Sequence, residues 1–210
     1  TSREFEGREA GKPGGRKTAK YIQQKFEAIG LLAVVDSLQS KSYYQRVPLR
    51  GKSFSNNILG LVRGSQFPEE VIIITAHYDH LGMKGDAYYP GADDNASGVS
   101  ALQEIAQAFA EASKNGFPPK RSVLFIALAG EEKGLLGSQY YVDKDPIFSL
   151  KNTVVNLNMD MIGHLDERHP KDPNFVSIVG SDWQSTDLHK IHEKANEDYV
   201  GLELDYTFNA

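Results

Sequence analysis

Residues 69–80 read EEVIIITAHYDH, a run of β-branched residues that passes directly into a cluster of ionisable ones. A continuous apolar run of this length, without alternation, is typical of a strand that is covered on both faces. We therefore predict a central strand that ends at His77. In α/β sheets ligands bind outside the carboxyl ends of the strands, so the residues that follow the strand are candidates for chemistry.

Apolar strands and helices alternate on both sides of this stretch. Helical spacing of apolar residues predicts helices over roughly 15–29 and 97–113, in LLGSQYYV and in TDLHKIHEKANEDY. Further buried strands are predicted in RSVLFIALAG, TVVNLNMDMIG and NFVSIVG, and partly exposed ones in SYYQRVPL and SFSNNILGLVRG. This order predicts an α/β fold with a mainly parallel sheet covered on both faces. Because no linker or repeat interrupts it, we expect one domain, residues 1–210.

Composition excludes several classes of protein. The chain has 210 residues, a hydrophobic fraction of 40% and a net charge of −5, without a basic cluster that would attract nucleic acid. Its longest apolar runs, VIIITA and VLFIALA, are far shorter than the ~20 residues of a membrane span, and no signal-peptide pattern is present. The absence of cysteine excludes disulfides, thiolate zinc sites and a cysteine nucleophile.

Ionisable residues follow three of the predicted strands: His77 and Asp79, Glu131 and Glu132, and Asp160. A loop that precedes a helix, GADDNASG, adds two adjacent carboxylates. A single acid in such a place is ordinarily a helix cap or a solvated turn residue. Several carboxylates at one sheet edge, however, repel one another unless a cation lies among them. One imidazole with several carboxylates and no thiolate suits Zn²⁺, Co²⁺ or Mn²⁺.

The number of candidate ligands limits how many metal ions the site can hold. His77, Asp93, Glu132 and Asp160 are too few to fill two tetrahedral shells unless one carboxylate bridges. A bridging carboxylate holds two ions about 3.5–4 Å apart, which is the spacing of hydrolytic two-metal sites. We predict that Asp93 is the bridge, because it lies in the most pliable loop.

The four motifs TAHYDHLG, PGADDNASGVSALQEIA, ALAGEEKGLLGSQYYV and NLNMDMIG, in this order, resemble the di-zinc aminopeptidases. That group contains bacterial leucyl aminopeptidases, aminopeptidase Y, glutamate carboxypeptidases and glutaminyl cyclases. The N-terminal segment GREAGKPGGRKTAKYIQQKFEAIGL also resembles the start of the family. The resemblance implies a three-layer α/β/α sandwich with a mixed, mainly parallel sheet. It also implies a metallo-exopeptidase that uses two zinc ions per complete site to remove residues from peptides with a free N-terminus.

The resemblance assigns a role to each metal ligand. His77 and Asp160 would be terminal ligands of one zinc ion, and Glu132 a terminal ligand of the other. Asp93 would bridge the two ions, and the peptide bond between Asp93 and Asp94 would be cis. Asp94 would be a structural acid that accepts N–H groups of the loop.

Two further acids receive roles that involve no direct contact with metal. Asp79 would accept the free imidazole N–H of His77. Glu131 would be the general base, taking a proton from the metal-bridging water and delivering it to the departing amine. Adjacent side chains diverge on an extended or turning backbone, which also argues against Glu131 and Glu132 holding the same ion.

One family ligand is missing. The family closes the second zinc shell with a histidine in an HTP-like segment near its C-terminus, and this chain ends at DYTFNA without one. None of the other histidines matches that context: His80, His164, His169, His189 and His192. We therefore expect a fragment that lacks the family's C-terminal elements and binds its second zinc ion weakly or not at all. For the parent protein we expect an extracellular or periplasmic location.

Two alternatives remain beside the aminopeptidase. A glutamate-carboxypeptidase-like enzyme would use the same ligands but recognise a terminal carboxylate. A catalytically inactive binding domain could share the fold, although His77, Asp93 and Glu131, whose loss would point there, are all present. A glutaminyl cyclase is disfavoured, because it needs one zinc ion and departs from the ADD and EE patterns that this chain keeps.

Overall fold

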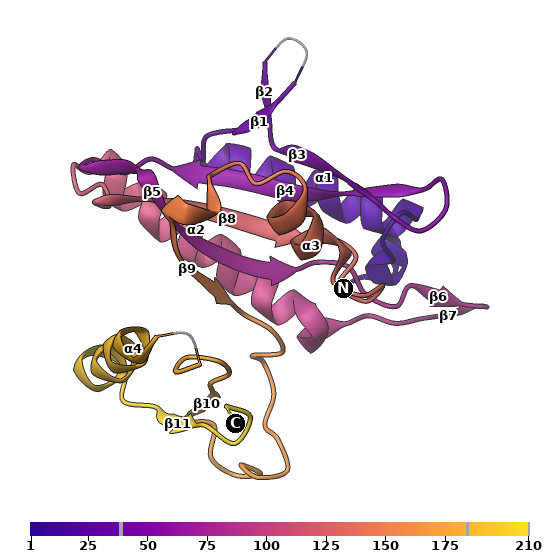
Figure 1. Cartoon of the computed structure of the whole chain (residues 1–210). Coiled ribbons are helices and arrows are strands. Elements are labelled where there is room, and N and C mark those ends of the chain that lie inside the picture. Colours follow the sequence, from indigo (N-terminus) through magenta and orange to yellow (C-terminus); the bar gives the residue numbers. More distant parts are fainter. Residues whose placement is uncertain (38–39, 184, 210) are drawn as a thin grey trace. The chain divides into compact units, whose positions relative to one another are not determined.

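The computed structural model describes residues 1–37, 40–183 and 185–209 (Figure 1). The chain divides into two units, Thr1–Met161 and Ile162–Ala210, and each is described by itself. The expectation of a single domain over residues 1–210 stays a prediction. Among the described residues, none of the helices has the length and apolar character that crossing a membrane requires.

The first unit consists of strands and helices in the predicted alternation. Its helical segments are η1 (Arg3–Arg8), α1 (Pro13–Ile29), η2 (Ala92–Ser97), α2 (Gly98–Lys114), α3 (Leu136–Asp143) and η3 (Leu150–Asn152). Its strands are β1 (Val35–Asp36), β2 (Lys41–Ser42), β3 (Tyr44–Pro48), β4 (Phe54–Val62), β5 (Phe67–His77), β6 (Met83–Lys84), β7 (Ala87–Tyr88), β8 (Arg121–Leu128) and β9 (Thr153–Asn158). The three helices predicted in this unit are confirmed, with small differences at their ends.

A five-stranded sheet forms the middle of this unit, in the order β3-β4-β8-β5-β9 (Figure 1). Strand β5 pairs in parallel with β8 and β9, whereas β4 is antiparallel to β3 and β8. The sheet is therefore mixed, with two parallel and two antiparallel pairings. Strand β5 lies between two partners and ends at His77, as its unbroken apolar run predicts.

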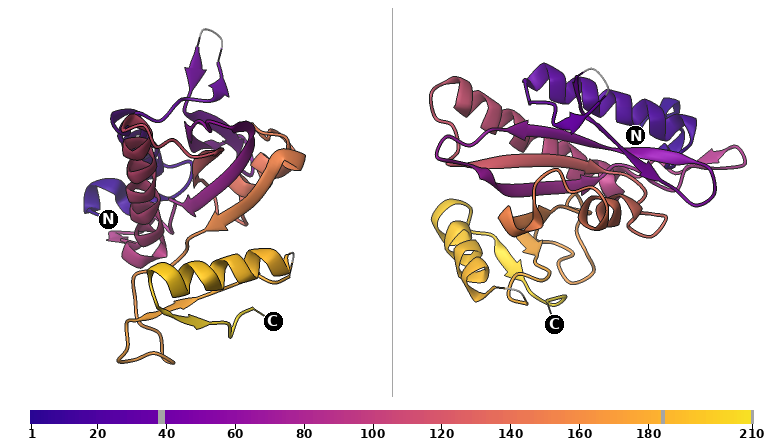
Figure 2. Two further views of the ribbon diagram at one scale, coloured as in Figure 1. Left: turned by 90° about the vertical axis from the view of Figure 1, so that its left-hand side faces the viewer. Right: turned by 45° about the horizontal axis from the view of Figure 1, so that its top comes forward.

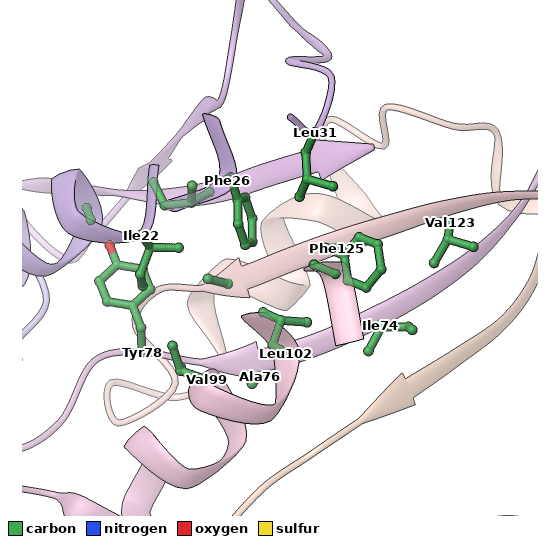
Figure 3. Close-up of a cluster of buried hydrophobic side chains, with 14 of the residues drawn as sticks. Ile22, Phe26, Leu31, Ile74, Ala76, Tyr78, Val99, Leu102, Val123 and Phe125 are labelled. Carbon is green, nitrogen blue, oxygen red and sulfur yellow. The ribbon is translucent and has the colours of Figure 1, made fainter. Parts of the chain in front are cut away.

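Helices α1 and α2 cover one face of the sheet. Figure 3 shows Ile22 and Phe26 of α1 and Leu102 of α2 packed with Ile74 and Phe125 of the strands. All except Ile74, which is 6% exposed, are completely buried. Full burial of one such side chain contributes about 1.5–3 kcal/mol to stability, so this face anchors the sheet.

The opposite face of the sheet is covered by α3 and the segment after it (Figure 2). Because successive side chains of a strand point to opposite faces, Leu124 and Ile126 of β8 pack here against Tyr141. The three layers of the predicted sandwich are thus present, and the ends of the strands are held between two packed faces.

Strand β9 differs from the prediction of a buried strand. Val154 is 54% exposed and Leu157 is 46% exposed. Among the described residues β9 is an edge strand that pairs only with β5, so it lacks the cover that its apolar composition suggested.

The second unit contains a short sheet and one helix: β10 (Phe175–Ser177), α4 (Thr186–Tyr199) and β11 (Glu203–Asp205). Strands β10 and β11 pair with each other in parallel. The strand predicted in NFVSIVG therefore exists but belongs to this two-stranded sheet and not to the central one. Helix α4 confirms the predicted polar helix, and its side chains are not buried.

Candidate metal centre

The predicted site residues that follow strands lie together at the carboxyl ends of three neighbouring strands, β8, β5 and β9. In the parallel register of the sheet, His77 of β5 lies opposite Leu128 of β8, and Thr75 lies opposite Asn158 of β9. The ionisable residues that follow each strand therefore emerge at one edge. The loop of η2, which precedes α2, brings a further carboxylate to the same place. All of these residues belong to the first unit.

One group of possible ligands surrounds His77. Its Nε2 atom lies 3.3 Å from Oδ1 of Asp94 and 3.3 Å from Oδ1 of Asp160. Two ligands of one tetrahedral zinc ion, each bonded at about 2.0–2.1 Å, lie about 3.3 Å apart. His77 is only 3% exposed, so its ring is held in this orientation. The donor set and its spacing thus fit a zinc ion.

A second group contains His80, Asp94 and Glu132. Nδ1 of His80 lies 2.8 Å from Oε1 of Glu132 and 3.5 Å from Oδ2 of Asp94. The 2.8 Å separation is a hydrogen-bond distance, shorter than the edge of a zinc tetrahedron. Oδ1 of Asp94 faces His77 and Oδ2 faces His80, so this carboxylate is common to both groups.

The carboxylate that faces both groups is that of Asp94, whereas the sequence-based prediction placed the bridge at Asp93. Within η2, Asp94 (φ −94°, ψ 97°) and Asn95 (φ −129°, ψ 45°) leave the helical conformation. The Asn95 side chain donates to the carbonyl of Met159 at 3.0 Å and accepts from the amide of Gly98 at 3.0 Å. This fastens the loop to the end of β9 and turns Asp94 toward the cluster. Among the described residues, neither ligand group includes Asp93.

The peptide bond predicted to be cis is also displaced by one residue. The cis bond joins Asp94 and Asn95, and the bond between Asp93 and Asp94 is trans. The backbone carbonyl of Asp93 accepts a hydrogen bond from Oγ of Ser97 at 2.7 Å.

Asp79 contacts His77 differently from the prediction. Nδ1 of His77 lies 3.2 Å from the backbone carbonyl of Asp79 but 3.9 Å from its carboxylate. The carboxylate instead accepts a hydrogen bond from the amide of Glu131 at 3.1 Å and so joins the ends of β5 and β8. Burial raises the pKa of Asp79 to about 6, against the lowering effect of this amide and of His77.

Glu131 lies beside the cluster without belonging to either ligand group of the described residues. Burial raises the pKa of this partly buried carboxyl; His77 opposes the shift, and the negative charges of Glu132, Asp160 and Asp94 add to it. Neighbouring Glu132 belongs to the second group. The two adjacent glutamates thus occupy different positions, as the divergence of adjacent side chains predicts.

The acidic surroundings also act on the buried histidine. Burial by itself lowers the pKa of His77, but hydrogen bonding to Asp160 and the charges of Asp160, Asp79 and Glu131 outweigh this and raise it to about 9. In the metal-free protein at neutral pH, a proton on His77 therefore partly neutralises the carboxylates. A bound cation would serve the same purpose.

His80 is the site residue that sequence reasoning left without a role. It is 8% exposed and contacts Glu132, which lies 52 residues further along the chain. Its spacing of three residues from His77 in HYDH was the available signal.

A third group, Asp166, His169 and Asp205, lies in the second unit. Arg168 already forms ion pairs with both carboxylates, so we assign no metal there.

Comparison with known proteins identifies a protein family whose model matches most of this chain. Residues 57–199 match the model of peptidase family M28. Aminopeptidase YwaD of Bacillus subtilis (strain 168) is 37% identical over 120 residues, which are 55% of this chain and 24% of that protein. All five residues of the two ligand groups in the first unit lie within the matched range.

The solved structures that are similar to this chain include two aminopeptidases. BSAP, a zinc aminopeptidase from Bacillus subtilis, superposes with a TM-score of 0.59 and 31% identity over 74% of this chain and 35% of its own. The LapA aminopeptidase of Legionella pneumophila gives a TM-score of 0.67 and 26% identity over 96% of this chain and 50% of its own. The chain thus spans half or less of the length of these three relatives. The match over most of the chain, together with the shared fold, shows that the chain belongs to peptidase family M28.

Proposed function

We propose that this chain carries the catalytic site of a zinc aminopeptidase, which hydrolyses the N-terminal residue from peptides. The observation that carries this proposal is the position of Asp94, whose two oxygens face two separate groups of ligands. The names of the relatives support it, because YwaD, BSAP and LapA are each described as aminopeptidases, and BSAP as a zinc enzyme.

The residues would divide between two ions. His77, Asp94 and Asp160 would hold one zinc ion, and Asp94 with Glu132 would hold the other. Zinc, when bound, lowers the pKa of a coordinated water to about 7 and polarises a carbonyl group. We assign His80 to orienting the Glu132 carboxylate, because its 2.8 Å contact is a hydrogen bond and not a ligand-to-ligand edge.

Glu131 would act as the general base and acid of the reaction. A base is most effective when its pKa approaches the working pH, and the pKa of Glu131 is raised by burial. It would accept a proton from the attacking water and return it to the departing amine. The hydrogen bond from its backbone amide to Asp79 holds the segment that carries it.

The function can be tested with pairs of peptides that differ only at their ends. The purified zinc-loaded protein should hydrolyse a peptide with a free N-terminus at least about 100-fold faster than its N-acetylated form, because a site that binds the amine leaves buried polar groups unpaired without it. A chelator should abolish the activity and zinc should restore it. Equal rates on both peptides would overturn the aminopeptidase. Cleavage that required a free C-terminus would identify a carboxypeptidase instead.

Zinc binding should also depend on pH. Because the pKa of His77 is raised to about 9, its imidazole is protonated at pH 7, and zinc binds only the neutral ring. Binding at pH 7 should therefore release about one proton, and apparent affinity should rise up to about tenfold per pH unit until pH 9. Calorimetry in two buffers of different ionisation enthalpy measures this release. The same titration at pH 9.5 is the control, since release from His77 should fall there to about a quarter of a proton. No proton release at pH 7 would contradict the prediction.

A further inference from the structure

Arg8 is a buried cation that binds two separate segments of the metal centre. Its side chain donates to four backbone carbonyls: Tyr78 at 2.9 Å, Pro90 at 2.6 Å, Gly91 at 2.8 Å and Asp94 at 3.3 Å. The residue is only 4% exposed. A buried guanidinium is costly unless its donors are satisfied, and here backbone carbonyls accept four hydrogen bonds from it.

The carbonyls that Arg8 binds belong to the segments that carry the ligands. Tyr78 lies directly after His77, and Asp94 provides the carboxylate shared by the two groups. These two partners are 70 and 86 residues from Arg8 in the sequence. One side chain thus links the end of β5 to the loop of η2. Arg8 itself lies outside residues 57–199, the range that matches the family model.

The backbone around Arg8 is held in an uncommon conformation that directs this side chain inward. Glu6 and Arg8 have φ angles of 49° and 57°, in the left-handed region that residues other than glycine rarely adopt. The carbonyl of Gly7, between them, accepts a hydrogen bond from the amide of Gly82 at 3.0 Å. Such conformations persist where the surrounding structure enforces them, often at functional sites.

The loop is shaped to admit the guanidinium. Gly91 has a φ of 52°, and a Cβ atom at this position would lie 2.6 Å from Nη2 of Arg8 and 2.3 Å from the carbonyl of Asp94. A side chain at position 91 would therefore push the guanidinium and the loop apart. Burial lowers the pKa of Arg8, and the negative charges of Asp94, Asp79 and Glu132 oppose this shift.

We propose that Arg8 is a positioning residue for the metal centre, which holds the backbones of Tyr78 and Asp94 so that His77 and Asp94 stay at ligand spacing before metal binds. The proposal rests on the proposed function in that the ligands are those of the zinc site. Lysine would keep the charge but, as a single ammonium group, could not reach four carbonyls in two segments. Replacement of Arg8 by lysine therefore removes the hydrogen bonds that position the two segments while it keeps the positive charge.

The experiment compares Arg8→Lys and Arg8→Met with the unchanged chain. Zinc affinity is measured by competition with a chelating dye. Amide hydrogen exchange is followed by mass spectrometry in the presence of chelator, in peptides that cover residues 76–98 and in β8 as a reference. Arg16→Lys is the matched control, because Arg16 is exposed and donates one hydrogen bond, to the carbonyl of Gly11 at 2.7 Å.

Both Arg8 variants should lose at least about tenfold in zinc affinity, the scale of loss when a support of a metal ligand is removed. Exchange in the loop should accelerate at least about tenfold while exchange in β8 is unchanged. Arg16→Lys should alter neither quantity. Arg8→Lys within twofold of the unchanged chain in both measurements would overturn the proposal, and so would uniformly faster exchange throughout the chain, which indicates a merely structural role.

A measurement on the unchanged chain covers the case in which the variants fail to fold. The Nε–H resonance of Arg8 should be protected from solvent exchange without metal and should shift when zinc is added. Rapid solvent exchange, or no shift on binding, would overturn the proposal. A chain that binds no zinc but shows the local exchange effect in Arg8→Lys would refute the proposed function and leave the positioning of the loop supported.

Discussion

Asp94→Asn is expected to lower zinc affinity by more than about 100-fold and to abolish peptidase activity. Removal of a partner that merely supports a metal ligand costs about 10–100-fold in affinity, so loss of a carboxylate that faces two ions should cost more. Oδ1 of Asp94 lies 3.3 Å from His77, and Oδ2 lies 3.5 Å from His80. Asparagine keeps the shape of the side chain but replaces one anionic oxygen by an amide. Zinc titration of the purified variant measures the loss.

The neighbouring residue provides the matched control. Asp93→Asn makes the same chemical change one residue away, and the hydrogen bond from Ser97 to its backbone carbonyl is retained. We expect zinc affinity within about threefold of the unchanged chain, because among the described residues Asp93 belongs to neither ligand group. The opposite outcome, with Asp93→Asn losing zinc and Asp94→Asn retaining it, would restore Asp93 as the bridge.

The fold was largely predictable because its decisive signals are local. The unbroken β-branched run before His77 was sufficient to predict a strand covered on both faces. Strand β5 ends at that residue, as predicted. Helix α1 ends at Ile29, where the predicted helix also ends, and the following Gly30 takes a left-handed conformation. Each of these features depends on residues that are close together in the chain.

Features set by distant neighbours were not predictable. Whether Val154 and Leu157 of β9 are buried depends on which elements pair with that strand, and apolar composition does not contain this information. The same holds for Phe175–Ser177, which could join either sheet on the basis of its residues.

The site shows the same division between local and distant causes. The strand ends supplied His77, Glu132 and Asp160 directly, because the parallel register brings those ends to one edge. The choice between Asp93 and Asp94 depends on loop dihedral angles, which the Asn95 contact with Met159 sets from 64 residues away. The pattern of apolar and polar residues in the sequence does not indicate that Asn95 contacts Met159.

Glu131→Gln is expected to lower turnover by about 10²–10⁴-fold while zinc affinity stays within about threefold of the unchanged chain. Glutamine cannot accept and return a proton, but it preserves the size of the side chain. The hydrogen bond from the backbone amide of residue 131 to Asp79 is also preserved. Among the described residues Glu131 belongs to neither ligand group, so its loss should leave the metal in place. Peptide hydrolysis at saturating substrate and zinc titration of the same preparation separate the two effects.

The control for this variant is Glu104→Gln, an exposed glutamate on α2 that should leave both quantities unchanged. Glu132→Gln supplies the opposite pattern, because Glu132 is within 2.8 Å of His80 and belongs to the second ligand group. Its activity should fall together with its zinc affinity. Normal turnover in Glu131→Gln would remove Glu131 as the base. Equal loss of zinc from the Glu131 and Glu132 variants would show that both glutamates hold metal, against the divergence of adjacent side chains on which the assignment depends.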